Sequence, residues 1–146
     1  MASLRSVSDS IVIDASPAEI FAVLADPRRH HLIDGSSSVR GMVQGPPRLG
    51  PGAQFGMRMR FVLPYRVTNT VAEFDEGRLI AWHHAAKARW RYELTPRPDG
   101  HTEVRESFDW SRSPVALGIE LARFPARNLI SIRQTLIRLK RLVEAR

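Results

Sequence analysis

The sequence of 146 residues contains no cysteine and no long apolar run. Without cysteine, neither a disulfide framework nor a thiolate metal site is possible, in keeping with a reducing compartment. The first ten residues lack the apolar core of a signal peptide, and no segment approaches the roughly 18 apolar residues of a membrane span. We therefore expect a soluble, cytoplasmic protein. The length predicts one domain over residues 1–146 with a core of its own.

Acidic residues are also scarce, with 15 against 22 basic ones and a net charge of +7. From Arg123 onward there are seven basic residues and one acidic residue, Glu144, so six of the seven net positive charges fall in this stretch. Such a helix face is suited to nucleic acid or an anionic membrane. It is equally typical of a solvated helix whose cations favour its C-terminal end. No nucleic-acid-binding motif accompanies the charge, and a nucleic-acid partner is not expected.

The last third of the chain predicts one long amphipathic helix, from Val115 to Arg146. Its C-terminal half repeats large aliphatic residues at steps of three and four, namely Leu129, Ile132, Leu136, Leu139 and Val143. The same face is mostly small upstream, at Gly118, Leu121, Ala122, Pro125 and Asn128. We expect a bend at Pro125. The small residues indicate a pocket between this helix and a curved sheet, unless aromatic side chains of the sheet fill that space.

The rest of the chain predicts about seven strands and two short helices. After a strand over residues 6–14, Ser16, Pro17 and Glu19 form the capping-box pattern of a helix start, and a second short helix follows over residues 28–32. Alternating or β-rich runs then cover residues 39–43, 54–61, 65–74, 79–85, 89–94 and 102–111. Neighbouring strands of such a meander pair antiparallel, and only the terminal helix is long enough to cover the sheet. The order β-α-α-β6-α predicts an α+β fold in which a curved sheet grips one helix.

Three stretches have the form of strand-to-helix and hairpin junctions, namely I-V-I-D-A-S-P-A-E-I-F-A-V-L-A-D-P (Ile11 to Pro27), F-D-E-G-R-L-I-A-W (Phe74 to Trp82) and Y-E-L-T-P-R-P-D-G-H-T-E-V (Tyr92 to Val104). In these stretches and in its element order the whole chain resembles the START-like, or Bet v 1-like, superfamily (SRPBCC), with its bacterial polyketide cyclase/dehydrase-type proteins. The resemblance implies the helix-grip fold, with a deep apolar cavity that holds lipids, polyketides or other hydrophobic molecules. A minority of such proteins are enzymes, among them aromatase/cyclases.

Polar residues on apolar strand faces are the candidates for chemistry, because burial without a partner is costly. Glu106 alternates in phase with Val104, Phe108 and Trp110, and His84 with Trp82. Glu106 and His84 are therefore the candidate catalytic acid/base pair, with an inward arginine as another partner for the carboxylate. The alternatives are a structural ion pair of Glu106 with an arginine, or burial of the other strand face.

The remaining candidates would shape the binding site. Trp90 and Tyr92 share one strand face, and Tyr92 offers one directed hydrogen bond. Arg58 and Arg60 belong either to a solvent-facing strand surface or to a ligand-carboxylate site. The predicted ligand-binding residues are Tyr92, Trp90, His84, Glu106, Phe108, Gly118, Leu121, Pro125 and Asn128, with His31 and Asp34 at the cavity mouth.

No motif points to a metal or a cofactor. A zinc site from His30 or His31 with Asp34 and His84 can be drawn, but no recognisable metal-ligand spacing supports it. A nucleophile elbow, a phosphate-binding glycine loop and a dinucleotide fingerprint are all missing, so we expect no metal and no cofactor.

Three functions remain open on the sequence. The first is a non-catalytic carrier, sensor or scavenger of a small hydrophobic molecule, active as a monomer or homodimer. The second is a cyclase or dehydratase that uses an acid/base pair in the same cavity. The third is a basic helix face that binds nucleic acid or an anionic membrane.

Overall fold

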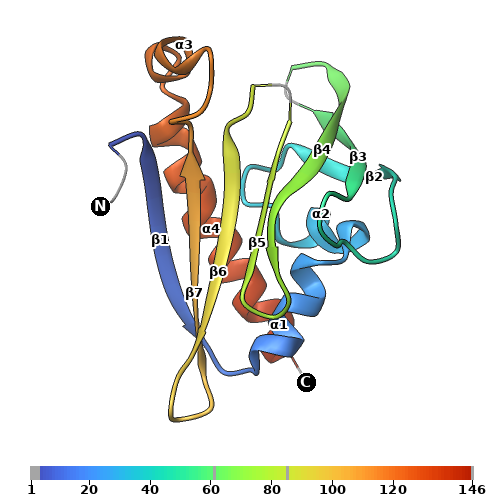
Figure 1. The fold of residues 1–146 in the computed structure, drawn as a ribbon, viewed down its shortest axis with the longest axis vertical. Coiled ribbons are helices and arrows are strands. Elements are labelled where there is room, and N and C mark those ends of the chain that lie inside the picture. The colour runs from blue at the N-terminus through green and yellow to red at the C-terminus, as the bar shows by residue number, and fades with distance from the viewer. Residues whose placement is uncertain (1–3, 61, 85, 146) are drawn as a thin grey trace.

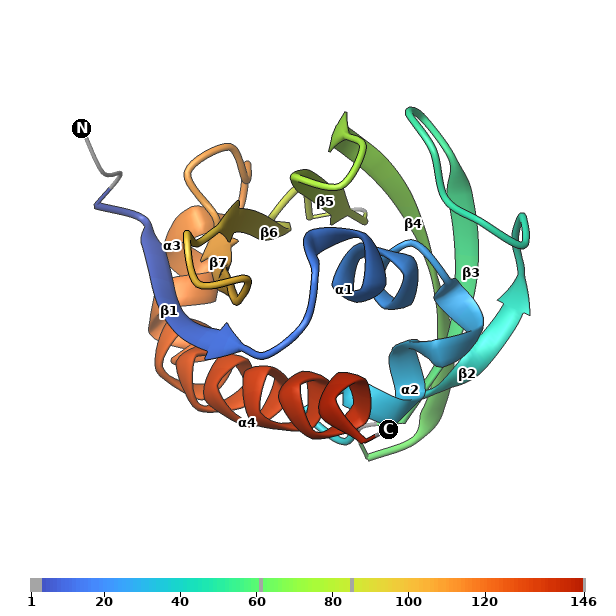
Figure 2. The ribbon, with the colours of Figure 1, turned by 90° about the horizontal axis from the view of Figure 1, so that it is seen from below.

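A seven-stranded antiparallel sheet curves around a long C-terminal helix in the computed structural model, which describes residues 4–60, 62–84 and 86–145 (Figures 1 and 2). The strands are β1 (Ser6–Ile13), β2 (Val39–Gln44), β3 (Gln54–Arg60), β4 (Pro64–Asp75), β5 (Leu79–His83), β6 (Arg89–Pro96) and β7 (Thr102–Asp109). Their order is β1-β7-β6-β5-β4-β3-β2, so β2 to β7 form a meander and β1 adds to β7. The predicted α+β helix-grip fold is confirmed. Phe61, Ala85 and Arg146, which were placed at the ends of predicted elements, lie outside the described residues.

Short helices connect β1 to β2 and lie inside the curve of the sheet (Figure 2). They are α1 (Pro17–Leu24), the 3-10 turn η1 (Pro27–Arg29) and α2 (His30–Ile33). The hydroxyl of Ser16 accepts a hydrogen bond from the Glu19 N–H at 3.2 Å, and the Asp26 carboxylate accepts one from the Arg28 N–H at 3.0 Å. Both side chains cap the starts of these elements, and the cap at Ser16 is the one that the sequence predicts.

The terminal helix is two helices, so the prediction of one helix bent at Pro125 is wrong. α3 (Ala116–Leu121) ends before Arg123, whose φ of 60° is left-handed, and α4 (Phe124–Glu144) begins directly after it. Pro125 therefore lies in the first turn of α4 and not in a helix interior. Proline needs no hydrogen-bond donor in a first turn, whereas inside a helix it would remove one backbone bond.

The C-terminal part of α4 packs on the sheet, as its aliphatic stripe predicts. Ile132, Leu136 and Leu139 are buried and join a core with residues of β1 and β7, such as Ile13 and Val104. No helix within the described residues is long and apolar enough to cross a lipid bilayer.

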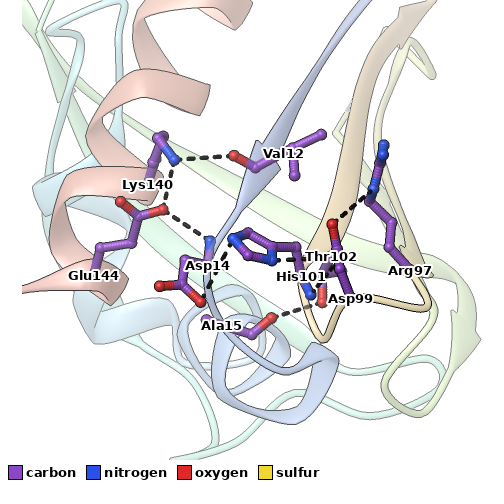
Figure 3. Close-up of polar contacts among 9 residues, drawn as sticks. All are labelled: Val12, Asp14, Ala15, Arg97, Asp99, His101, Thr102, Lys140 and Glu144. Atoms are coloured by element: carbon purple, nitrogen blue, oxygen red, sulfur yellow. Dashed lines mark hydrogen bonds and ion pairs between the residues drawn. The ribbon is translucent and has the colours of Figure 1, made fainter.

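Polar contacts tie the last turn of α4 to the end of β1 (Figure 3). The Glu144 carboxylate accepts a hydrogen bond from the Asp14 N–H at 2.8 Å, and the Lys140 ammonium donates one to the Val12 carbonyl at 3.0 Å. These contacts hold one end of α4 against the sheet. The other half of α4 lies beside the cavity described next.

Candidate functional site

A cavity of about 120 Å³ lies between α4, α2 and the concave face of the sheet. Its apolar wall includes Ile33, Phe55, Met57, Trp82 and Trp90. An engineered apolar cavity of about 150 Å³ in another protein binds benzene, so this space suits a single small ring. The residues at its rim are half-buried or exposed, namely Ser36, Met59, Val67 and Ser131, whereas the residues at its floor are buried.

Two buried acidic groups meet on this floor. Tyr92 of β6 and Glu106 of β7 are direct cross-strand partners, and the Tyr92 hydroxyl donates a hydrogen bond to Glu106 Oε2 at 2.9 Å. The residues are 4% and 2% exposed, and within the described chain Glu106 Oε1 has no hydrogen-bond partner. A buried polar atom of this kind is uncommon and points to a missing partner.

Burial favours the protonated forms of both groups. It raises the pKa of the Glu106 carboxyl well above its usual range, and the nearby Asp34 charge adds to this effect. Burial also raises the pKa of Tyr92 well above its usual value, and its contact with Glu106 adds to this effect. Glu106 therefore stays a neutral carboxylic acid to a higher pH than an exposed glutamate does, and a neutral acid has an O–H that can donate a hydrogen bond.

His30 contributes a neutral ring to the wall. Its Nε2 lies 2.8 Å from the Leu24 carbonyl, which only accepts, so Nε2 carries the proton and Nδ1 is the free acceptor of the neutral ring. The imidazole stacks on Trp82 with 4.8 Å between ring centroids. Burial lowers the pKa of His30 to about 4, so the ring is uncharged at neutral pH.

Most of the other polar groups of the lining are occupied by the fold. Thr135 Oγ1 accepts a hydrogen bond from the Gly35 N–H at 2.8 Å, and Asp34 Oδ2 accepts one from the Val39 N–H at 2.9 Å. Asp34 thus shapes the rim by holding the turn before β2. Asn69 of β4 is buried in the lining, where its amide adds a polar group opposite α4.

The structure brings together part of the predicted ligand site. The lining includes Tyr92, Trp90, His84 and Glu106, and Asp34 at the rim. The partner of Glu106 is Tyr92, whereas the sequence suggested His84 or an arginine. Burial, and then the neighbouring His83 charge, lower the pKa of His84.

Other predicted positions lie elsewhere. Gly118 and Leu121 are solvent-exposed on α3, with Leu121 83% exposed, so their assignment to the cavity wall is wrong. The break at Arg123 turns α3 away from the sheet face that α4 covers. Pro125 and Asn128 belong to the first turns of α4, ahead of Ser131 and Thr135, and are not part of the lining.

Two further predicted residues, Phe108 and His31, are not part of the lining. Phe108 is buried in the core, where its ring centroid lies 4.9 Å from that of Trp90 and 5.7 Å from that of Trp110. It packs beside Trp90, its direct partner on the neighbouring strand, and does not line the cavity. His31 is exposed, and its neighbour His30 is the buried histidine.

The predicted ligand-binding residues did not include His30, which was named only as a possible zinc ligand, or the polar lining residues Ser36, Asn69, Ser131 and Thr135. Three of them show the signal that identified Glu106, a polar residue in phase with apolar ones. His30 precedes the buried Ile33 by three helical positions, Thr135 lies within the aliphatic stripe of α4, and Asn69 alternates with valines of β4.

The charged candidates have other surroundings. Arg58 and Arg60 are exposed on the outer face of β3, as their alternation with buried residues predicts. Part of the basic face of α4 is neutralised by ion pairs within the protein. Arg133 pairs with Asp9 at 3.0 Å, and Lys140 pairs with Glu144. Within the described residues, no three histidine, aspartate or glutamate side chains are clustered as metal ligands.

A curved antiparallel sheet that grips a long helix around a mainly apolar cavity defines the START-like, or SRPBCC, class of proteins. Within that class the chain belongs to the polyketide cyclase/dehydrase and lipid transport family, whose model matches residues 5–144.

Individual relatives agree with this assignment. The chain is 38% identical over 138 residues to the uncharacterized protein Rv0088 of Mycobacterium tuberculosis, covering 91% of this chain and 62% of that protein. This chain thus spans less than two thirds of that relative. The solution structure of the KanY protein (ms6282) has a TM-score of 0.73 at 20% identity, covering 99% of this chain and 100% of that one. The AHSA1-like protein from Aeromonas hydrophila has a TM-score of 0.68 at 19% identity, covering 95% and 93%. At these identities the two structures show the common fold.

Proposed function

We propose that the protein binds a small hydrophobic molecule that presents an acceptor oxygen, such as a carbonyl, to Glu106. In this proposal the apolar walls supply affinity and the acid orients the ligand, and the protein acts as a carrier, sensor or scavenger. Polyketides and related acyl compounds combine carbonyl oxygens with an apolar frame, in keeping with the family description.

The observation behind this proposal is the unpartnered oxygen of Glu106. Tyr92 occupies Oε2, while Oε1 is buried without a partner in the described chain and belongs to a residue of the cavity floor. A carboxyl group kept neutral by burial donates its hydrogen bond without the cost of desolvating a charge. A ligand acceptor oxygen at this position would satisfy the group.

The aromatic side chains favour a flat ligand. Trp82 lies between His30 and Tyr92, with ring centroids 4.8 and 5.6 Å away, and Phe55 meets it edge-on. Such rings offer faces and edges to a planar molecule, and each aromatic contact adds about 0.5 to 1.5 kcal/mol beyond area burial.

Two probes of nearly the same shape test the role of the acid. Acetophenone has a carbonyl oxygen where α-methylstyrene has a methylene group, so the pair isolates one hydrogen bond. We expect acetophenone to bind the protein about tenfold more tightly, the value of one buried hydrogen bond. Quenching of Trp82 and Trp90 fluorescence and ligand-observed NMR measure both affinities.

Variants of Glu106 provide the control. Glu106→Gln keeps an N–H donor and should retain the preference, whereas Glu106→Leu fills the space without a donor and should lose it. Equal binding of both probes to the protein, or an undiminished preference in Glu106→Leu, would contradict the proposal.

The second candidate is an enzyme of the cyclase or dehydratase kind. It is favoured by the approach of two titratable groups to 2.9 Å inside the cavity. Because burial favours the protonated form of both groups, their chemistry would be that of a general acid that protonates a carbonyl or a leaving hydroxyl. Native mass spectrometry of protein purified from its host would show a bound compound as added mass. Conversion of that compound on incubation would favour the enzyme, and its unchanged recovery would favour the carrier.

A further inference from the structure

We propose that the end of the molecule formed by α3 and the β3–β4 turn docks on the surface of an anionic lipid membrane. Both segments lie at the same end of the long axis, opposite the C-terminus of α4 (Figure 1). We call this region the docking end. It is distinct from the outer face of α4, where the sequence concentrates positive charge.

Large apolar side chains are exposed at the docking end. In the β3–β4 turn and the start of β4, Val62, Leu63 and Tyr65 are 77%, 73% and 45% exposed. Around α3, the exposed apolar residues are Val115, Leu117, Leu121 and Phe124. Seven of the ten large hydrophobic side chains that are strongly exposed in the described residues thus lie in two segments at one end. Clustered exposed apolar residues on a protein surface mark an interaction site.

Arginines surround the apolar turn. A shallow surface hollow beside it is lined by Arg40, Arg58, Arg60 and Arg66, with Tyr65 and Pro64, and its described lining includes no carboxylate. The sequence from residue 35 to residue 72 contains no acidic residue, and four of its five arginines lie on β2, β3 and β4, whereas the fifth, Arg48, lies in the β2–β3 loop and pairs with Glu76. Apolar side chains that insert between headgroups, flanked by cations that pair with lipid phosphates, are the chemistry of interfacial membrane binding.

The docking end adjoins the rim of the cavity. Met59 of β3 lines both the arginine hollow and the cavity, and Val67 and Val39 of the neighbouring strands also belong to the cavity lining. A hydrophobic ligand would therefore pass between the bilayer and the cavity over a short apolar path. The transfer of a ligand between bilayer and cavity rests on the proposed ligand binding, whereas membrane docking itself does not.

A nucleic acid explains these features less well. Arginines alone would suit a phosphate backbone, but exposed valine and leucine side chains gain little from it, and single-strand binding uses stacked aromatic platforms. Insertion into the headgroup region accounts for the apolar and the basic residues together.

Sedimentation with vesicles tests the proposal on the whole chain. We expect binding to vesicles of phosphatidylcholine and phosphatidylglycerol in equal parts, little binding to phosphatidylcholine alone, and weaker binding as salt is raised. The double variant Val62→Ser/Leu63→Ser should bind at least about tenfold more weakly, because it removes the inserting side chains. The double variant Arg60→Gln/Arg66→Gln should bind the mixed vesicles about fivefold more weakly for each arginine removed.

Matched variants outside the docking end provide the controls. Leu32→Ser removes an exposed leucine of α2, and Arg141→Gln removes an exposed arginine in the last turn of α4, so both should bind vesicles like the parent protein. Glu106→Leu should also bind vesicles normally, and the docking variants should keep their affinity for acetophenone, so failure of one proposal is distinguishable from failure of the other. Absence of binding to the mixed vesicles would overturn the proposal. Vesicle binding that is unchanged in the Val62→Ser/Leu63→Ser variant and is displaced by duplex DNA would also overturn it. That result would instead indicate a nucleic-acid surface.

Discussion

Glu106 and His30 lie in the lining of the same cavity, and burial shifts their pKa values in opposite directions. Burial disfavours whichever form is charged, so it raises the pKa of the acid and lowers that of the base. Burial therefore favours the neutral form of both side chains, which can act as hydrogen-bond donors or acceptors. Neutral side chains suit the binding of an uncharged ligand. Their shifted pKa values also make the free energy of unfolding depend on pH.

For Glu106, the pKa in the folded protein lies above the value of 4.5 for an unperturbed glutamate, so the folded state holds a proton that the unfolded state releases. The stability that this proton provides is fully present below pH 4.5 and is lost as the pH rises towards the folded pKa. Glu106→Gln removes the titration, and its free energy of unfolding should improve on that of the parent protein by about 1.4 kcal/mol per pH unit across this window.

Urea denaturation at a series of pH values measures this difference. Tyr92→Phe is the control, because burial and not the phenol raises the pKa of Glu106, so the parent slope should persist. A Glu106→Gln curve parallel to that of the parent protein would show that Glu106 is ionised in the folded state.

At the scale of single elements, contact of the α2–β2 connection with α4 sets the width of the cavity. Gly35 lies directly after α2, and a Cβ at this position would be 2.3 Å from the Ser131 carbonyl oxygen and 2.6 Å from the Thr135 nitrogen. Both are backbone atoms of a regular helix and have no room to move away. Only glycine permits this close approach, and Ser131 and Thr135 are the residues of α4 that line the cavity.

Gly35→Ala should therefore destabilise the protein by about 3 kcal/mol, since overpacking forces the connection away from α4. It should also weaken acetophenone binding, because Thr135 loses the hydrogen bond from the Gly35 N–H. Gly50→Ala is the matched control: its Cβ would meet nothing within 4 Å, so a change below about 0.5 kcal/mol is expected. Equal stability of the two variants in denaturant melts would contradict the close packing.

Element boundaries show how far local signals reach. Ser16 caps α1 where the sequence predicts it, because a cap depends on residues three or fewer positions apart. The division between α3 and α4 was not predicted, because proline is compatible both with a bend inside a helix and with the first turn of a new one. The left-handed conformation of Arg123 decides between them.

At the scale of the whole molecule, the two buried groups oppose each other in their effect on stability. The folded pKa of His30 is about 4 against 6.5 when unperturbed, so its stabilising contribution is present above pH 6.5 and is lost as the pH falls towards 4. The loss amounts to roughly 3 kcal/mol across this window. The contribution of Glu106 changes in the opposite sense above pH 4.5.

We expect the falling contribution of Glu106 above pH 4.5 to offset the rising contribution of His30, so the free energy of unfolding of the parent protein should vary less between pH 4.5 and 6.5 than either group alone would make it. His30→Gln keeps a donor for the Leu24 carbonyl but removes the titration, so its stability should already decline from pH 4.5 upward. Denaturation curves of both proteins at matched pH values check this, and the same pH profile in both would rule out a neutral, buried His30.

The pairing on the cavity floor marks the limit of the sequence reasoning. Alternation placed Glu106 and Tyr92 on inward faces, and both are buried. Predicting their contact would have required the register of the β6–β7 hairpin as well. That hairpin pairs residues equidistant from Asp99, and Tyr92 and Glu106 lie seven residues before and after it. In β4, by contrast, a register shift between Val71 and Glu73 places Phe74 in the core region, and no pattern of alternation predicts such a bulge.

The sequence by itself determined the fold class, the capped start of α1, the aliphatic stripe of α4 and the inward face of β7. These are periodic or short-range properties, set by side-chain geometry within a few residues. Only the tertiary structure decided that Tyr92 rather than His84 meets Glu106, that His30 and Thr135 complete the lining, and that Gly118 and Leu121 face solvent. Those outcomes depend on strand register, on a helix break and on the approach of α4 to residues about 100 positions away, where packing of distant segments overrides local pattern.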